Sequence, residues 1–364
     1  MARLRMAVIG VGHLGKEHAR ILAGLPEVDL VGVADVNAEQ AQAVARRWQT
    51  QAYGDYWPLL NLVDAACIVV PTSHHAAVAG DFLRRGIPVL IEKPLAPSRG
   101  EADALVELAD HHGALIQVGH IERFNPAFEA LLRRPLQAKY VRCERLGPFT
   151  GRSGDIGVVL DLMIHDLDLL LAVVQSPVVS VDALGVRMFG THEDAANARL
   201  HFANGCVADL TASRAHPVPH RRMHLWGPEG YAGIDFAKKR LSLTQPSDEL
   251  RRCGIDPSKL DAASRARLKD DLFDRYFESL DLDHPGQDQL TAELKEFVHC
   301  VKTGSRPRIG GHEARDAIAL AEQILASLRS HSWTGEANGP CGPTNLPAPV
   351  GPLFQPFGEE EQVA

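Results

Sequence analysis

The 364-residue sequence has no long hydrophobic run, although 45% of its residues are hydrophobic. A helix needs about 18 or more consecutive apolar residues to cross a bilayer, and no stretch here reaches that length. The first six residues, MARLRM, lead directly into a strand-like segment rather than into the apolar centre of a secretion signal. We therefore expect a cytoplasmic protein with no membrane-inserted segment.

The sequence also lacks the cysteine and histidine spacings of metal sites. None of its six cysteines forms a Cys-x-x-Cys pair, and several lie inside apolar runs. The neighbouring pairs among its 17 histidines, His74-His75 and His111-His112, are adjacent rather than four residues apart, so neither pair places two ligands on one helical face. We expect reduced, structural cysteines and no bound metal.

Positive charge is not in excess either. The chain has 38 Lys and Arg residues against 46 Asp and Glu residues, which gives a formal net charge of -8. Proteins that bind nucleic acids or anionic membranes usually present a basic surface. We therefore expect a small-molecule partner rather than a nucleic acid or a membrane.

The first 120 residues alternate strand-like and helix-like segments, a pattern typical of a parallel sheet with helices on both faces. The strand-like segments are 5–10, 29–34, 65–70, 88–91 and 115–118, and the helix-like segments are 16–23, 38–48, 75–85 and 98–112. From about residue 140 a helix-like run at 158–174 precedes β-branched segments at 178–186, 196–202, 206–213, 223–226 and 231–236, which predict an antiparallel sheet. Two helices, 288–303 and 312–330, follow.

The predicted fold class is therefore α/β plus α+β. An N-terminal doubly wound Rossmann domain (1–121) precedes a domain (122–331) built on a large, mostly antiparallel sheet with helices on one face. The last helix of that domain could pack back on the Rossmann domain. Residues 245–286 are charged and indicate an insertion with one amphipathic helix near 260–280, and residues 332–364, rich in proline and glycine with an acidic end, predict a disordered tail.

A glycine-rich turn follows the first strand. Residues 10–15 are Gly-Val-Gly-His-Leu-Gly, in which Gly10 permits the tight turn, Gly12 lets the backbone approach a pyrophosphate, and Gly15 allows close packing of helix on strand. Asp35 ends the second strand twenty positions after Gly15 (35 − 15 = 20), where a carboxylate binds the adenosine ribose and repels a 2′-phosphate. This pattern predicts NAD rather than NADP as the cofactor.

Two further segments carry polar groups suited to proton transfer. The apolar run at 89–91 ends on Glu92-Lys93-Pro94, at the carboxyl end of a predicted strand where open sheets bind ligands. Asp161 and His165 are four residues apart in a helix-like run, so they share a helical face, and Asp168 lies one turn further. Each segment alone also fits a plainer structure, namely a solvated turn and a helix with a polar stripe.

Together these segments resemble the Gfo/Idh/MocA oxidoreductase family over residues 4–330. The resemblance rests on the glycine turn, Asp35, Glu92-Lys93-Pro94, the Asp161 and His165 pair, and the 71–75 segment Pro-Thr-Ser-His-His. It implies a catalytic site formed by Lys93, His165 and Asp161. It also implies an NAD site formed by Gly10, Gly12, His13, Leu14, Gly15, Asp35, Pro71, Thr72, His75, Glu92 and Lys93.

Residues 117–126, 145–149 and 158–166 are similar to the branch of this family that oxidises UDP-N-acetylglucosamine at C3 for lipid A biosynthesis. Guanidinium groups match phosphate oxygens, so arginines near these segments would suit a diphosphate. The implied substrate contacts are Lys93, Arg123, Asn125, Arg145, Arg152, Asp161 and His165.

We therefore expect NAD-dependent oxidation of a secondary sugar alcohol, with His165 taking the hydroxyl proton, Lys93 stabilising oxyanion charge or sharing the proton relay, and Asp161 orienting His165 or a substrate hydroxyl. Whether Lys93 or His165 is the main base stays open at this point. Two alternatives are a dehydrogenase of a free polyol or sugar, such as myo-inositol or glucose, and a non-catalytic NAD-binding regulator. The resemblance also implies a homodimer or homotetramer that packs the open sheet faces together.

Overall fold

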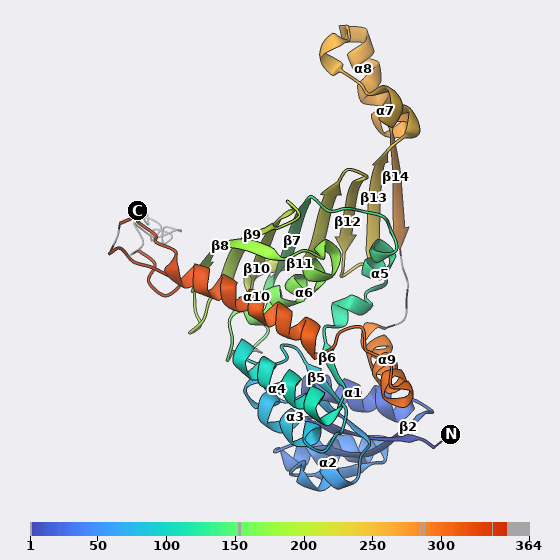
Figure 1. The fold of residues 1–364 in the computed structure, drawn as a ribbon, viewed down its shortest axis with the longest axis vertical. Helices are drawn as coiled ribbons and strands as arrows, with labels where there is room; N and C mark the ends of the chain where they lie inside the picture. The colour runs from blue at the N-terminus through green and yellow to red at the C-terminus, as the bar shows by residue number, and fades with distance from the viewer. Residues whose placement is uncertain (1, 152–153, 284–285, 287, 337, 348–364) are drawn as a thin grey trace, which may run out of the picture.

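The strands of the computed structural model form two sheets among the residues that it describes, which are 2–151, 154–283, 286, 288–336 and 338–347. Figure 1 shows one sheet at the lower end of a tall molecule and the other in its middle, with helices between and around them. The predicted substrate contact Arg152 and residues 348–364 of the predicted tail lie outside the described residues.

The first sheet is parallel throughout and has the strand order β3-β2-β1-β4-β5-β6. Its central strands are continuous apolar runs because helices cover both of their faces. The strands are β1 (Leu4–Ile9), β2 (Val28–Ala34), β3 (Gln51–Tyr53), β4 (Ala65–Ile68), β5 (Val89–Glu92) and β6 (Ile116–Gly119). Helices α1 (His13–Gly24), α2 (Ala38–Trp48) and α9 (Gln289–Thr303) pack on one face, and α3 (His75–Leu83) and α4 (Arg99–His112) on the other.

The second sheet has the order β14-β13-β12-β11-β7-β10-β9-β8 and is antiparallel except where β7 pairs with β10. Helices α5 (Pro126–Leu132), α6 (Ile164–Val174) and α10 (Gly311–Ser330) lie on one face (Figure 1), and α10 also packs against α4 of the first domain. The strands are β7 (Tyr140–Pro148), β8 (Val178–Val186), β9 (Ala195–Phe202), β10 (Val207–Ser213), β11 (Ala215–Gly227), β12 (Gly230–Asp235), β13 (Arg240–Pro246) and β14 (Phe277–Asp283). The predicted fold class is confirmed.

The segment predicted as an insertion differs from its prediction. The expected helix at 260–280 is only α8 (Ala262–Asp271), which ends in a π-helical turn, η6 (Leu272–Tyr276), before the chain returns as β14. Strands β13 and β14 pair with each other and extend the sheet, and α7 (Asp248–Cys253) and α8 project from its end as an arm (Figure 1). The described residues of α7 and α8 include no buried side chain, so α8 has no apolar face that would extend it.

The described part of the predicted tail is folded rather than disordered. The backbone N–H of Trp333 donates to Pro340 O at 3.0 Å, and its indole Nε1 donates to Gly342 O at 2.9 Å. The backbone N–H of Arg187, one residue beyond β8, donates to Pro343 O at 3.1 Å. A pattern rich in proline and glycine gives no periodic signal for such a packed turn.

The structure also bears on the expectations about membranes, metals and cysteines. None of the described helices is long and apolar enough to span a bilayer. Within the same residues, no group of three or more His, Cys, Asp and Glu side chains is arranged to hold a metal ion. All six cysteines are free, and four of them are buried: Cys67, Cys143, Cys206 and Cys300.

Candidate active site

The glycine-rich turn between β1 and α1 has the shape of a dinucleotide site. Gly10 has a φ of +85°, and a Cβ there would lie 2.5 Å from Val69 O. A Cβ at Gly15 would lie 1.9 Å from Gly10 O, whereas a Cβ at Gly12 would meet nothing within 4 Å. Gly10 and Gly15 are therefore required by close backbone packing, and Gly12 leaves open space where the amino end of α1 offers its amides.

Asp35 lies at the end of β2 beside this turn. Its carboxylate accepts the backbone N–H groups of Val11 and Asn37, both at 2.8 Å, and the side-chain Nε2 of Gln40 at 3.2 Å. Val36 beside it is 97% exposed. The open turn, the amides of α1 and the acid at the end of β2 together fit a dinucleotide without a 2′-phosphate.

Some of the polar residues near the glycine turn hydrogen-bond to other protein groups. Glu92 at the end of β5 contacts His18 of α1, with 2.9 Å between Oε1 and Nε2. Burial opposes ionisation of Glu92, but the hydrogen bond and the charges of His18 and Lys93 outweigh it and lower the pKa of Glu92. His75 is buried, and its two ring nitrogens lie 2.9 Å from Pro94 O and Val70 O. His75 thus supports the loop, and its predicted contact with NAD stays a prediction.

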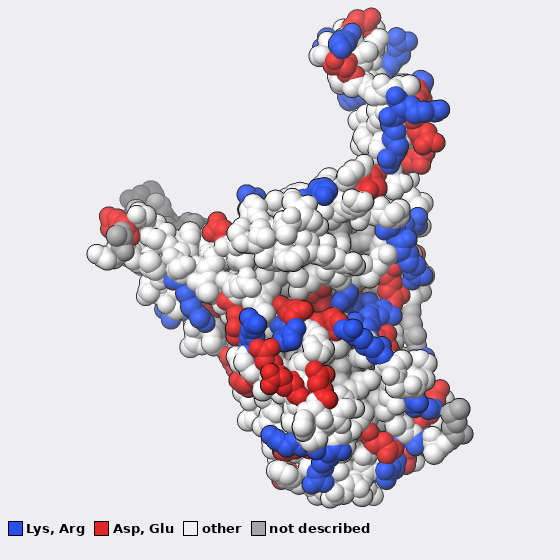
Figure 2. All heavy atoms as spheres, viewed as in Figure 1, with Lys and Arg blue, Asp and Glu red and all other residues white. Residues whose placement is uncertain are grey.

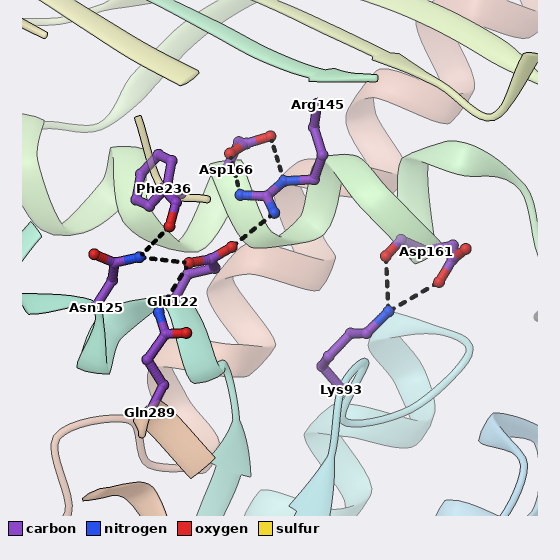
Figure 3. A network of polar contacts seen from close by, with 8 residues as sticks. All are labelled: Lys93, Glu122, Asn125, Arg145, Asp161, Asp166, Phe236 and Gln289. Carbon is purple, nitrogen blue, oxygen red and sulfur yellow. Dashed lines mark hydrogen bonds and ion pairs between the residues drawn. The ribbon is translucent and has the colours of Figure 1, made fainter. Parts of the chain in front are cut away.

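Lys93 joins the two domains. Its Nζ donates to the backbone O of Asp161 at 2.7 Å and to the Oδ1 of the same residue at 2.9 Å (Figure 3). Lys93 comes from the loop after β5, and Asp161 belongs to a π-helical turn, η4 (Val159–Met163), that precedes α6. Asp161 thus lies in an irregular turn rather than in a regular α-helix, and its oxygens bind Lys93; its predicted role of orienting His165 or a substrate hydroxyl stays a prediction.

His165 lies in the first turn of α6 with a buried Nδ1 that has no hydrogen-bond partner among the described residues. Burial, followed by the positive charges of Lys93 and Arg145, lowers its pKa well below 6.5. The ring of His120, just after β6, lies edge-on to it with centroids 6.3 Å apart. Asp168, which could have held His165, pairs with Arg123 at 2.9 Å. His165 is therefore neutral at neutral pH and free to accept a proton.

A buried ion cluster stands beside this imidazole. The Arg145 guanidinium donates to Glu122 at 3.0 Å and to both oxygens of Asp166 at 3.0 and 2.8 Å (Figure 3). The three side chains are only 5%, 7% and 3% exposed. Asn125 is buried too, and its Nδ2 donates to Glu122 and to Phe236 O.

The predicted substrate contacts are thus brought to one region but are not equally available. Arg123, Asn125 and Arg145 already have protein partners, so they link the elements around the site to each other. Their contact with substrate stays a prediction. Figure 2 shows acidic and basic side chains interleaved where the two domains meet, rather than a face of one sign.

Several residues of the site were not predicted. His120 and Glu122 lie in the 117–126 segment, and Asp166 follows His165, so each lay next to a recognisable motif. His18 carried no local signal, because its partner Glu92 is 74 positions away. Arg221 of β11 also carried no local signal. Its charge acts on His165 because the pairing of β11 with β7 places it opposite Arg145.

A parallel sheet with a glycine turn for a dinucleotide, next to a lysine and a neutral histidine, defines an NAD-binding oxidoreductase. Comparison with known proteins agrees. Residues 4–120 match the oxidoreductase family with an NAD-binding Rossmann fold, and residues 128–232 match the Gfo/Idh/MocA C-terminal domain. The chain belongs to the Gfo/Idh/MocA family of oxidoreductases.

Among its relatives is UDP-N-acetylglucosamine 3-dehydrogenase of Acidithiobacillus ferrooxidans, which is 36% identical over 91% of this chain and 99% of the relative. A solved structure of that enzyme superposes with a TM-score of 0.79 and 35% identity, over 90% of this chain and 98% of the other. The scyllo-inositol 2-dehydrogenase (NAD(+)) of Bacillus subtilis is 31% identical over 90% of this chain and 95% of the relative. The chain is thus an oxidoreductase of the sugar and polyol class.

The first prediction concerns the stability of the ion cluster. Arg145→Met leaves Glu122 and Asp166 buried without a cation, so the free energy of unfolding should fall by about 3–5 kcal/mol. Urea denaturation followed by circular dichroism measures this. Arg84→Met is the control, because Arg84 pairs with Asp81 at the surface and its loss should cost about 1 kcal/mol or less. Equal shifts for the two variants would contradict the assignment.

The second prediction concerns the charge that acts on His165. Lys93→Met removes the cation with the largest effect on this imidazole, so the pKa of His165 should rise, but burial should still keep it below 6.5. NMR titration of ¹³C-labelled histidine gives the value, with the resonance assigned by its loss in His165→Asn. Lys139→Met, next to the start of β7, is the control and should leave the pKa of His165 unchanged. A lower pKa of His165 in Lys93→Met would contradict the prediction.

Proposed function

We propose that this protein oxidises the C3 hydroxyl of UDP-N-acetylglucosamine to the 3-keto sugar. The observation that carries the proposal is the position of His165, whose buried Nδ1 has no partner among the described residues, near a Lys93 held at the end of the dinucleotide-binding sheet. Burial and the charge of Lys93 lower the pKa of His165. The similarity to the Acidithiobacillus ferrooxidans enzyme over nearly the full length of both chains supports this choice of substrate.

In the proposed reaction His165 accepts the hydroxyl proton as the carbon–oxygen bond becomes a carbonyl. Its lowered pKa keeps the accepting nitrogen free of a proton at neutral pH. Bound NAD supplies the hydride acceptor. Lys93 is placed to stabilise negative charge on the reacting oxygen, because its side chain is only 16% exposed and so acts at low local dielectric.

Asp161 was expected to orient His165 or a substrate hydroxyl, and its contacts with Lys93 support a further role. Its backbone and side-chain oxygens both accept hydrogen bonds from Lys93, which fixes the position of the ammonium group. We infer that Asp161 sets the direction of Lys93 and keeps the local charge near balance. Between the two candidate bases, this arrangement favours His165, since Lys93 is held by a carboxylate as an ammonium donor.

The third prediction tests these roles. His165→Ala and Lys93→Ala should each lower kcat for UDP-N-acetylglucosamine by about 100-fold or more, because each removes a group that acts on the transferring proton or the oxyanion. Turnover is followed as NADH absorbance, and NADH fluorescence checks that both variants still bind cofactor. The exposed His111→Ala and Lys139→Ala variants serve as controls. Near wild-type rates in both site variants would sink the mechanism.

A second candidate function keeps this chemistry and changes the substrate to a free polyol. It is favoured by the similarity to the scyllo-inositol 2-dehydrogenase of Bacillus subtilis. Product analysis by mass spectrometry with UDP-N-acetylglucosamine, myo-inositol, scyllo-inositol and glucose separates the two. Oxidation of a free polyol, with none of the nucleotide sugar, would select the second candidate.

We further infer that the 3-keto sugar is an intermediate for amination in lipid A biosynthesis and that the enzyme works in the cytoplasm. This placement rests on the resemblance of the 117–126, 145–149 and 158–166 segments to the branch that supplies that pathway. Lipid A from a strain that lacks the gene should then have lost the amine at the sugar C3 position, as measured by mass spectrometry. An unchanged amine content would refute the placement.

The fourth prediction concerns assembly, which we propose uses the open face of the second sheet. Tyr140, His224, Trp226 and Tyr231 form an aromatic cluster on the face opposite the helices, and Trp226 is 39% exposed. Large exposed apolar side chains in contact favour self-association. Light scattering should give the mass of a dimer or tetramer, and Trp226→Glu should shift it toward the monomer. A monomeric wild-type chain would end this proposal.

A further inference from the structure

Arg221 faces the active-site side of the second sheet. It lies on β11 directly opposite Arg145 of β7, and opposed residues of an antiparallel pair point to the same face. Arg145 points toward α6, where it binds Asp166. Met223 and Leu225, two and four residues further along β11, are buried on that face, whereas Arg222 points to the opposite one.

Unlike the other arginines near the site, Arg221 is not neutralised. It is exposed, and within the part of the chain that the structure describes it makes no ion pair and no side-chain hydrogen bond. Arg145 and Arg123 bind three carboxylates between them. The charge of Arg221 nevertheless reaches the site, because it contributes to the lowered pKa of His165 and acts on Asp166 as well.

The backbone around Arg221 is held by a hydrogen bond, and two lysines lie in the turn after β12. Its carbonyl accepts the N–H of Phe236 at 3.0 Å, and the Phe236 ring packs 5.7 Å from the Arg145 guanidinium. Lys238 and Lys239 follow Phe236 in the turn between β12 and β13, and neither makes an ion pair among the described residues. Asp235 at the end of β12 pairs with Arg222 and accepts the backbone N–H of Lys238, so Arg221 and the two lysines are the cations here without an ion pair among the described residues.

We propose that Arg221 binds the diphosphate of the nucleotide-sugar substrate. This inference rests on the proposed function and assigns the substrate group that the second domain recognises. In a nucleotide sugar only the pyranose ring separates C3 from the anomeric phosphate, so a phosphate ligand must lie close to the group that deprotonates the C3 hydroxyl. A guanidinium fork matches phosphate oxygens, and a free polyol has no group to use it. Arg221 is thus a specificity-determining residue.

The fifth prediction uses UDP as the probe and isothermal calorimetry in the presence of NAD. Arg221→Gln should weaken UDP binding by about 10- to 100-fold, the usual effect of losing a charged hydrogen bond. Arg221→Lys keeps the charge without the fork and should fall between that variant and wild type. Arg222→Gln is the matched control, since it makes the same change one residue away on the other face and should alter affinity by about two-fold or less.

The outcomes separate this inference from the proposed function. Unchanged UDP affinity in Arg221→Gln, an equal loss in Arg222→Gln, or no binding of UDP to the wild-type enzyme overturns the role of Arg221. Oxidation of UDP-N-acetylglucosamine by an Arg221→Gln variant with an unaltered KM overturns it as well, while the proposed function stands. UDP binding that depends on Arg221, in an enzyme that does not oxidise UDP-N-acetylglucosamine, supports the phosphate site and refutes the proposed substrate.

Discussion

The two hydrogen bonds from Lys93 to Asp161 hold together the parts of the site that come from different domains. Lys93 belongs to the loop after β5, and Asp161 to the turn before α6, 68 positions later. The ammonium group contacts both the backbone and the side chain of Asp161, which lies in the π-helical turn η4. The same turn leads into α6 and places His165 near Lys93, whose charge acts on the imidazole. Loss of this contact would release the Lys93 ammonium group from the turn that leads to the base.

His165 lies in charged surroundings, in which buried ion pairs fix the positions of the charges. Arg145 remains charged because two buried carboxylates outweigh its desolvation, and its pKa is raised. Burial raises the pKa of Asp166, and the adjacent guanidinium opposes that rise. The cluster is therefore an internal support that also places a positive charge near the base. Positive charge near a buried imidazole favours its neutral form, which is the form that can accept a proton.

The sequence predicted most of the elements and the identity of the central residues. The buried parallel strands and the glycine turn carry strong local signals, so β1, β2, β4, β5, β6 and the helices between them were placed to within a few residues. The short β3 and the β13 and β14 pair were missed, because they depend on pairing with strands far away in the sequence. The turn formed by residues 332–336 and 338–347 was missed because a segment rich in proline and glycine gives no periodic signal. The hydrogen bonds from Lys93 to Asp161 were not predicted, because helical spacing gives the face of a residue only where the helix is regular, and η4 is a π-helical turn.

The arginines show most clearly what a sequence pattern leaves out. Arg123 and Arg145 were prominent because they lie in recognisable segments, but whether a guanidinium is available to a ligand depends on the carboxylates that the fold brings to it. Arg145 meets Glu122 from η3 (Ile121–Phe124) and Asp166 from α6, two elements that meet only in the folded chain. Arg221 has no local motif, yet the alternation of β11 places it on the active-site face, where its charge acts on Asp166 but no carboxylate among the described residues forms an ion pair with it. For these arginines, the carboxylates that the fold brings to each guanidinium, rather than proximity to a motif in the sequence, determine which of them can contact a ligand.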